Sequence, residues 1–369
     1  MILKKTIKMI QKFEYKLIKN RKNSLYLCAG GFEDRVIGIF DNLKELNEKI
    51  FKYSVIMEYT AHDTIHEEDN KENLNFLKES LEKYSIHNLK NAIINIDNLL
   101  LSRNNLKDRL KELPETEIDS IFIDISGMTN FLILLTLKII QDTFHAIKIF
   151  ILYAEAKEYY PKKDEMDEIL TLVEKRDDES IMKLSDKLQA SGARETLIPI
   201  DFRGRFREDI PTALIFFAGY EPSRAIGLLE TYRPNIVIPC YGVSPHNRLG
   251  WRTKFSIKLH EKFKVFEQYP HLHHLENNLE ENITLSTFDI SEIINKLEKI
   301  YTCNIAGKIL YENYNIAISP QCSKLQAVAT YIFCQSHPDV QVVFCLPGRF
   351  NPKRYSENIG TSWLYELKC

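Results

Sequence analysis

The sequence lacks a clear excess of charge of either sign. Lys and Arg together number 49 and Asp and Glu together 51, which gives a formal net charge of −2 at pH 7. Proteins that hold nucleic acid through a general electrostatic field carry a surplus of basic residues. The net charge therefore does not indicate nucleic-acid binding, although a local basic surface remains compatible with it.

The chain also has no C-x-x-C pair and no long apolar run. Its seven cysteines are scattered, and in a chain of 369 residues this spacing favours reduced, mostly buried thiols over a disulfide framework. No apolar run reaches the roughly 18 residues that a membrane-spanning helix needs. Residues 1–23 are basic and interrupted by lysines, unlike a secretory signal, so we expect a basic N-terminal extension, no membrane partner and a cytoplasmic protein.

Two phosphate-binding signatures are absent as well. The sequence contains neither G-x-G-x-x-G nor G-x-x-x-x-G-K-[ST]. The histidines at 271, 273 and 274 have no Cys or acidic partner at the spacing of a zinc site. We therefore expect neither a cofactor nor a bound metal.

An internal repeat is the main positive feature of the sequence. The stretch CAGGFEDRVIGIF, residues 28–40, resembles FFAGYEPSRAIGLLETY, residues 216–232. Arg35 and Arg224 lie 189 residues apart, and each is followed by one residue and then by Ile-Gly. Three further matched pairs keep offsets of 191 to 193 residues: Asp97 with Asp289, Ser126 with Ser319, and Pro161 with Pro352. The near-constant offset predicts an internal duplication.

Both halves alternate short apolar runs with helical patterns. The expected strands are LYLCAG, YSVIMEY, AIINI, SIFIDIS and IKIFILY in the first half, and ALIFFAG, NIVIPCY, ITLSTF, YNIAIS and VQVVFCL in the second. This alternation predicts an α/β fold made of two tandem Rossmann-like units with mostly parallel sheets. We expect the first domain over residues 24–169, a helical linker over 170–208 and the second domain over 209–369.

The repeated polar residues follow the strands, and loops in that position emerge at the carboxyl edge of a doubly wound sheet, where ligands bind. The expected ligand-binding residues of the first half are Gly30, Gly31, Glu33, Arg35, Asp97, Asp124, Ser126, Gly127, Thr129 and Asn130. Those of the second half are Gly219, Glu221, Arg224, Asp289, Ser319, Gln321, Ser323, Lys324, Asn351, Arg354 and Tyr355.

Each group of these residues has a specific chemical use. Arg35 and Arg224 are candidate phosphate clamps, because a guanidinium binds two oxygens at once. Lys324 lies in the first turn of a predicted helix, where the helix dipole disfavours a cation. This unfavourable position suggests that Lys324 binds an anion. Purely structural uses remain open: a tight turn at the glycines, helix capping by the hydroxyl and amide side chains, and a rigid surface turn after residue 348. Arg248, Trp251 and Arg252 are weaker candidates for the same pocket or for a partner contact.

The stretch DISGMTN, residues 124–130, resembles the fourth-strand motif of the CRISPR-associated Rossmann fold (CARF) sensor domains. Residues 319–324 resemble it more weakly, since the aspartate is missing there. A fused pair of such domains is also similar to the SAVED type of anti-phage sensor. The resemblance implies a loop that contacts a cyclic oligonucleotide. No Arg-x4-His nuclease signature is present, so it further implies an effector on a separate chain.

Three functions remain open from the residues. The first is a sensor of a nucleotide, such as a cyclic oligonucleotide or related phosphorylated signal in prokaryotic anti-phage defence, which acts through an effector protein or a homo-oligomer. The second is a nucleotide-processing enzyme, a phosphodiesterase, ring nuclease or glycosidic-bond enzyme, which needs a general acid or base. The carboxylates available for that role are Glu33, Asp97, Asp124, Glu221 and Asp289, and none is assigned as catalytic. The third is a scaffold subunit of a defence complex.

Overall fold

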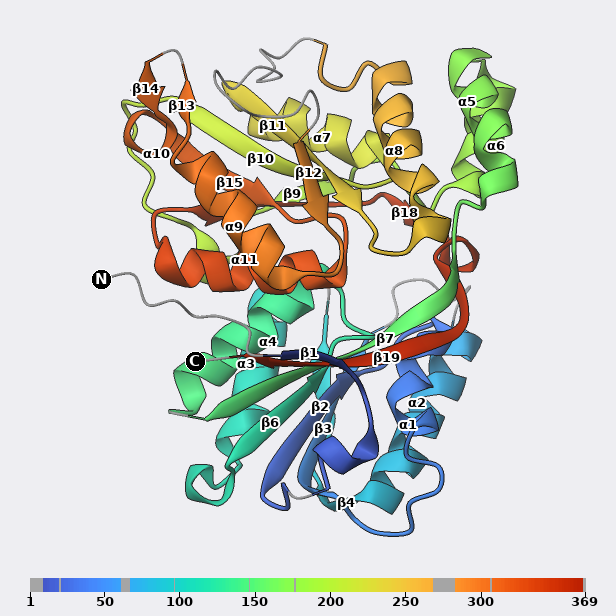
Figure 1. Ribbon diagram of the computed structural model, residues 1–369, viewed down its shortest axis with the longest axis vertical. Coiled ribbons are helices and arrows are strands. Elements are labelled where there is room, and N and C mark those ends of the chain that lie inside the picture. The colour runs from blue at the N-terminus through green and yellow to red at the C-terminus, as the bar shows by residue number, and fades with distance from the viewer. Residues whose placement is uncertain are drawn as a thin grey trace. The chain divides into compact units, whose positions relative to one another are not determined.

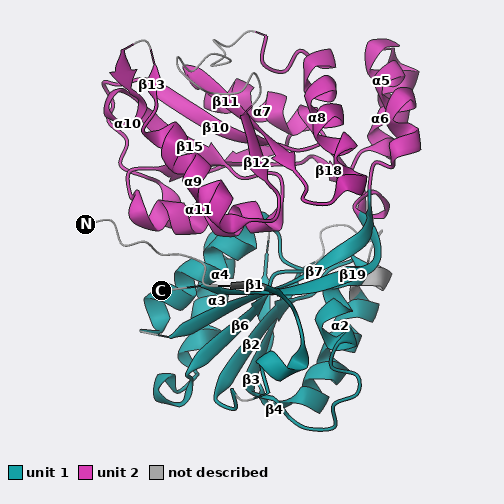
Figure 2. Ribbon diagram, in the orientation of Figure 1, with its two compact units in different colours: residues 1–159, 356–369 teal, residues 160–355 magenta. Residues whose placement is uncertain are grey.

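The computed structural model describes residues 9–19, 21–60, 67–95, 97–145, 147–175, 177–267, 283–305 and 307–367. The chain divides into two compact units (Figure 2). Unit 1 comprises residues 1–159 and 356–369, and unit 2 comprises residues 160–355. Unit 2 is therefore an insertion between two segments of unit 1.

Unit 1 is built on an eight-stranded sheet in the described part of the chain. Its order is β1-β19-β7-β6-β2-β3-β4, with β5 also paired to β3. The strands from β7 to β4 and β5 run parallel, whereas β19 runs antiparallel to β7, and β1 antiparallel to β19. The strands are β1 (Met9–Lys12), β2 (Ser24–Ala29), β3 (Phe51–Tyr59), β4 (Ser85–Asn88), β5 (Ala92–Ile94), β6 (Ser120–Asp124), β7 (Lys148–Tyr159) and β19 (Ser356–Leu367).

Helices cover both faces of the unit 1 sheet (Figure 1). The helices α1 and α2 lie on one face, and α3 and α4 lie together on the other. Their bounds are α1 (Gly38–Asp41), α2 (Glu67–Tyr84), α3 (Leu99–Lys111) and α4 (Asn130–Thr143). A buried strand with helices on both sides must be apolar on both faces, and β2 is buried along its whole length.

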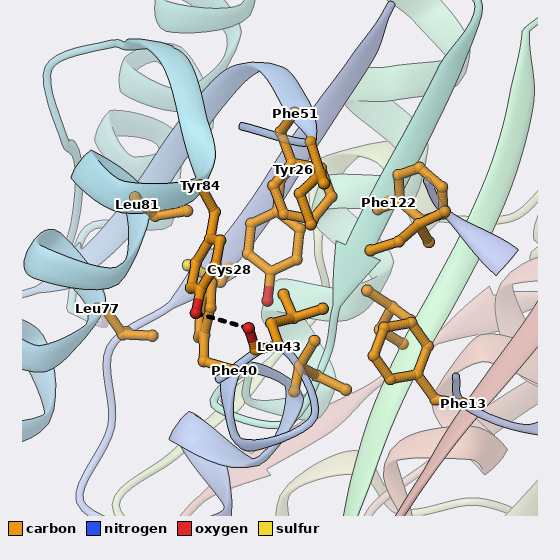
Figure 3. Packing of buried hydrophobic residues seen from close by; sticks show 14 of the residues in the cluster. Phe13, Tyr26, Cys28, Phe40, Leu43, Phe51, Leu77, Leu81, Tyr84 and Phe122 are labelled. Atoms are coloured by element: carbon orange, nitrogen blue, oxygen red, sulfur yellow. Dashed lines mark hydrogen bonds between the residues drawn. The ribbon is translucent and has the colours of Figure 1, made fainter. Parts of the chain in front are cut away.

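Aromatic side chains fill the core between the sheet and the α1–α2 layer (Figure 3). The rings of Tyr26 and Phe51 lie 4.6 Å apart, and Phe40 stacks on Tyr84 at 6.0 Å. The Tyr84 hydroxyl is hydrogen-bonded, because it donates to the backbone oxygen of Leu43 at 2.8 Å. Such satisfied hydroxyls let large aromatics occupy the core without an unpaired polar group.

Unit 2 contains a five-stranded parallel sheet in the order β12-β11-β10-β15-β16. These strands are β10 (Thr212–Ala218), β11 (Ile236–Val243), β12 (Ile283–Ser286), β15 (Asn315–Ser319) and β16 (Gln341–Val342). Short strands form three two-stranded sheets: β8 (Ala190–Ser191) with β18 (Arg349–Phe350), β9 (Glu195–Leu197) with β17 (Phe344–Leu346), and β13 (Asn304–Ile305) with β14 (Lys308–Ile309).

The helices of unit 2 alternate with these strands. The pair α9 and α11 pack side by side, and α5 packs against α6 and α8 (Figure 1). The helices are α5 (Met166–Lys175), α6 (Asp178–Lys187), α7 (Pro222–Tyr232), α8 (Trp251–Lys262), α9 (Ile290–Tyr301), α10 (Leu310–Asn313) and α11 (Lys324–Ser336). In the described parts of both units, no helix is long and apolar enough to cross a bilayer.

The two sheets share one strand order. In chain order, the five matched strands are β2, β3, β5, β6 and β7 in unit 1, and β10, β11, β12, β15 and β16 in unit 2. If each strand is numbered by its place along the chain, the spatial order across both sheets, from one edge to the other, is fifth, fourth, first, second and third. The predicted α/β, mostly parallel, Rossmann-like fold is confirmed, and every expected apolar run contains a strand. Common strand order is compatible with the predicted duplication, which stays a prediction.

The observed units differ from the expected domain boundaries at four places. Residues 160–169, expected in the first domain, belong to unit 2. Residues 356–367, expected in the second domain, form β19 and pair with β7 of unit 1. Residues 9–12, expected in a separate extension, form β1 and pair with β19. Residues 170–208, expected as a linker, contribute helices and short strands packed within unit 2. The C-terminal strand belongs to unit 1 because β19 pairs along its length with β7. The two strands are far apart in sequence, so local sequence patterns do not reveal this pairing.

Candidate ligand sites at the carboxyl edges

In unit 1 the ends of β2, β3 and β6 meet at the carboxyl edge of the sheet. The loop after β2 and the loop after β6 are in close contact, since a Cβ on Gly127 would lie 2.2 Å from the backbone oxygen of Ala29. Tyr59, at the end of β3, accepts a 2.9 Å hydrogen bond from the backbone N–H of Thr129. Asn73 of α2 donates a 2.7 Å hydrogen bond to the backbone oxygen of Gly31. Hydrogen bonds thus connect the loops after β2 and β6 to α2 and to the end of β3 at this edge.

A buried ion pair stands at this edge directly after β2. One terminal nitrogen of Arg35 lies 2.8 Å from Glu33, and the other donates a 3.1 Å hydrogen bond to the hydroxyl of Tyr153. Both side chains are less than one-tenth exposed. Burial alone would lower the pKa of Arg35, but the Glu33 carboxylate and the neighbouring Tyr153 and Tyr159 together raise it. The Nε of Arg35 is buried and makes no hydrogen bond in the described part of the chain.

The loop after β6 holds a second set of predicted residues. The carboxylate of Asp124 is buried and accepts hydrogen bonds from the Tyr26 hydroxyl at 2.8 Å and from the Ser126 N–H at 3.0 Å. The Ser126 hydroxyl accepts from the backbone of Ala154. Thr129 is the N-cap of α4 and accepts from a backbone N–H within the first turn. Thr129 therefore fills the capping role that the sequence left open, and Asp124 and Ser126 make structural hydrogen bonds within the unit.

Asn130 and Asp97 occupy the remaining positions of the unit 1 edge. Asn130 is the first residue of α4 and is partly exposed. Asp97 is exposed beside the start of α3, and its backbone N–H donates to the side chain of Asn95. Gly30 is buried, and its backbone N–H donates to Met57 at 2.9 Å.

Unit 2 has a matching Glu-Arg ion pair at its own edge, with Glu221 buried and Arg224 partly exposed. Arg224 lies 2.6 Å from Glu221, which directly precedes α7, and also donates twice to the backbone oxygen of Cys345 at 3.0 and 3.1 Å. Burial alone would lower the pKa of Arg224, but the charge of Glu221 and then that of Tyr355 raise it. Gly219 lies beside the loop after β15, where a Cβ would be 3.7 Å from the backbone oxygen of Gln321.

The loop after β15 resembles the loop after β6 in its capping. Ser323 is the N-cap of α11 and forms a reciprocal capping box with Gln326. Lys324 is the first residue of α11, as Asn130 is of α4, and is partly exposed. The Gln321 side chain is 8% exposed and donates to the Ser319 hydroxyl at 2.8 Å, but its Oε1 has no hydrogen-bond partner in the described residues.

The last predicted residues of unit 2 divide between two places. Tyr355 is close enough to Arg224 to influence its pKa. Arg354 instead lies 2.8 Å from both oxygens of Glu165 and donates to the backbone of Lys187. Asn351 donates to the backbone of the α6 C-terminal turn. Arg354 and Asn351 thus bind the α5–α6 region.

Asp289 is an N-cap. Its carboxylate accepts from the backbone N–H groups of Ser291 and Glu292, at 2.9 and 3.1 Å, at the start of α9. Across the described residues, no group of three or more His, Cys, Asp or Glu is placed to hold a metal ion. The histidines at 271, 273 and 274 lie outside the described residues.

Sequence reasoning missed Tyr59 and Asn73, and it gave Arg252 too little weight. Arg252, from α8, is buried and donates to the Tyr220 hydroxyl at 3.1 Å, beside Glu221. Its charge also acts on Cys322, whose pKa burial raises to about 12. The only local signal for Tyr59 was its place at the end of a predicted strand, and only the fold shows that it faces the loop after β6.

No family model and no curated protein matches the chain. Three solved structures show limited similarity. A type III CRISPR defence DNA nuclease activated by cyclic oligoadenylate is 8% identical, with 91% of this chain and 68% of that chain covered and a TM-score of 0.45. A lipopolysaccharide outer core galactosyltransferase, 12% identical over 86% of this chain and 92% of its own, has a TM-score of 0.21. Phosphoethanolamine N-methyltransferase 1 of Haemonchus contortus is 8% identical over 96% and 90%, also with a TM-score of 0.21.

Proposed function

We propose that the protein is a nucleotide-binding sensor whose two carboxyl edges each contact a phosphorylated ligand. The observation that carries the proposal is the matched polar edge. In each unit a Glu-Arg pair with a buried glutamate follows the first strand, and a hydroxyl-capped helix follows the fourth. The carboxyl edge is where open α/β sheets bind ligands. The resemblance of residues 124–130 to the CARF motif makes cyclic oligonucleotides the first ligands to test.

Unused hydrogen-bonding capacity at both edges supports a polar ligand. The buried Nε of Arg35 is a charged donor, and Oε1 of Gln321 is an acceptor. Buried polar atoms without partners are costly, so a site that retains them gains when a ligand supplies the missing group. The terminal guanidinium nitrogens of Arg35 and Arg224 already bind Glu33 and Glu221, so a phosphate would compete with these carboxylates for the arginines. Their role as phosphate clamps therefore stays a prediction.

The first turns of α4 and α11 offer the more accessible contacts. Both helices are longer than three turns, so the helix dipole at each N-terminus favours an anion. Asn130 and Lys324 occupy the same first position on these two helices and are partly exposed. We assign to them the contact with the ligand's phosphate or its polar edge. A separate effector chain or a second copy of this chain would then read the bound state.

No observation favours the enzyme over the sensor. Four of the five available carboxylates already have structural work: Glu33 and Glu221 pair with arginines, Asp124 accepts two hydrogen bonds, and Asp289 caps a helix. A general acid or base must be free to exchange a proton with the substrate. Turnover of a bound nucleotide would nevertheless be followed in the same samples.

Thermal unfolding with a panel of mono-, di- and cyclic oligonucleotides tests the proposal. A ligand that binds the native state raises its melting temperature. We expect one nucleotide class to do so for the unaltered protein, and the shift to shrink in Lys324→Ala and Asn130→Ala. The matched control is Lys299→Ala, an exposed lysine in the last turn of α9, at the end of that helix away from its carboxyl-edge N-cap. The absence of a shift with every nucleotide would refute the sensor and direct attention to a protein partner.

A further inference from the structure

The chain passes between its two units at two points that lie side by side. These crossings are Tyr159–Tyr160 and Tyr355–Ser356. On the unit 1 side, Tyr159 and Ser356 are opposite each other in the β7–β19 ladder. On the unit 2 side, the N–H of Tyr160 donates a 3.1 Å hydrogen bond to the backbone oxygen of Tyr355. The two crossings therefore form one continuous pair of chains rather than two independent tethers.

In unit 1 the candidate ligand loop after β2 is hydrogen-bonded directly to the crossing at Ser356 and is connected through Tyr153 to the crossing at Tyr159. The Ser356 hydroxyl donates a 2.5 Å hydrogen bond to Glu33, and the N–H of Asn358 donates to Asp34 at 2.8 Å. On the other strand, the Tyr159 and Tyr153 hydroxyls are 3.3 Å apart, and Tyr153 accepts from the Arg35 guanidinium. Neither crossing can shift without disturbing the Glu33–Arg35 pair.

In unit 2 the loop after β10 is bonded to the same crossing through one buried arginine. The two terminal nitrogens of Arg252 donate to the backbone oxygens of Tyr160 and Pro161, at 2.7 and 2.8 Å. Its Nε donates to the hydroxyl of Tyr220, the residue before Glu221, and its guanidinium lies 4.3 Å from the centre of the Tyr220 ring. Arg252 is 7% exposed, so its departure would leave two backbone oxygens of the crossing without this charged donor.

We propose that the paired crossings are a conformational coupling element that links the candidate ligand loop of one unit to that of the other. Arg252 is its positioning residue in unit 2, and Glu33 with Ser356 is its counterpart in unit 1. This proposal depends on the proposed function in one respect: the coupling would let a ligand bound at the edge of one unit change the conformation of the edge of the other. Coupling between distant sites needs a physical element that both sites bias, and the crossings meet that requirement by hydrogen bonds at each side.

Amide hydrogen exchange of the full-length protein without nucleotide tests the coupling. Arg252→Lys keeps the charge but loses the planar fork that serves two oxygens and a hydroxyl. We expect residues 30–38 and 356–360, both in unit 1, to exchange at least about fivefold faster, the lower end of coupling between sites. Residues 85–94 of unit 1, which do not contact the crossings, should be unchanged. The control Arg233→Lys alters the exposed arginine at the C-cap of α7 and should change neither region.

The reciprocal variant is Ser356→Ala, which should speed exchange in residues 160–165 and 219–224 of unit 2. Should Arg252→Lys fail to fold, Tyr220→Phe removes a single hydroxyl and is measured in the same way. Changes confined to the altered unit, or equal acceleration over all of unit 1, would overturn the coupling. Because no nucleotide is present, this result is independent of the ligand panel. Coupling without any nucleotide affinity would refute the sensor and leave the coupling element standing.

Discussion

Gly127 is the position where a single methyl group should do the most damage to the candidate site of unit 1. A Cβ built there would lie 2.2 Å from the oxygen and 3.1 Å from the carbon of the Ala29 carbonyl, and 3.2 Å from a Val36 methyl. A carbon–oxygen contact normally needs more than 3 Å, so one of the two loops must move by about 1 Å.

Neither loop can move freely. The N–H of Gly30, next to Ala29, is held by Met57 at 2.9 Å, and the loop after β6 is held by the Asp124 carboxylate and by a turn from Ile125 to Met128. Inserting a methyl group into such packing costs about 1–3 kcal/mol and occasionally more. We therefore expect Gly127→Ala to lower the free energy of unfolding by about 2–3 kcal/mol.

The matched control is Gly30→Ala, in the loop after β2. The nearest atoms to a Cβ there are Leu74 Cδ1 at 3.7 Å and the Met57 oxygen at 3.9 Å, which are ordinary contacts. Its effect should stay within about 0.5 kcal/mol, since such a change mainly restricts the unfolded chain. Urea unfolding followed by circular dichroism, with ligand-induced melting shifts on the same samples, measures both variants. Equal stability of Gly127→Ala and Gly30→Ala would refute the close packing of these two loops.

The remaining predictions concern buried polar groups. Burial lowers the pKa of His260 to about 4 from an ordinary 6.5, so its neutral form stabilises the fold above pH 6.5, and that contribution is lost as the pH falls towards 4. Over this range we expect the unaltered protein to lose roughly 3 kcal/mol more than His260→Phe in urea unfolding, and parallel pH profiles would contradict it. Asp124→Ala should cost about 2–4 kcal/mol, because Tyr26 and Ser126 lose their buried acceptor, whereas Asp124→Asn retains an acceptor and should cost less. Ser323→Ala should cost about 1 kcal/mol by removing the α11 cap, and a loss below 0.3 kcal/mol would show, by that same scale, that the cap is dispensable.

Much of the fold could be predicted because its signal is local. The strand LYLCAG is apolar at nearly every position, ends in Gly30 and is followed by Gly31, which is typical of a buried parallel strand that turns into a helix. The same reasoning located all ten matched strands and placed Glu33, Ser126, Glu221 and Ser319 directly at their carboxyl ends. Parallel strands then bring those ends to one edge, whatever else the chain does.

The sequence determined the roles of individual side chains less well than it determined the positions of the strands. A serine or aspartate at a strand end has the same local signature whether it caps a helix or meets a ligand. The structure shows that Asp289 and Ser323 cap helices and that Arg35 and Arg224 are paired with neighbouring glutamates. These are pairings at short range in sequence, but their burial is decided by packing.

The sequence by itself determined the alternation of strand and helix, the parallel sheets and the position of the polar loops, because periodicity and turn residues act over a few positions. Only the tertiary structure decided that β19 returns to β7 and that Arg252 binds the chain crossing at Tyr160. All of unit 2 lies between β7 and β19 in the sequence. Arg252 donates to backbone oxygens, which every residue carries, so no residue type marks its partners. Contacts of that kind depend on where the chain is in space and not on which residue it carries there.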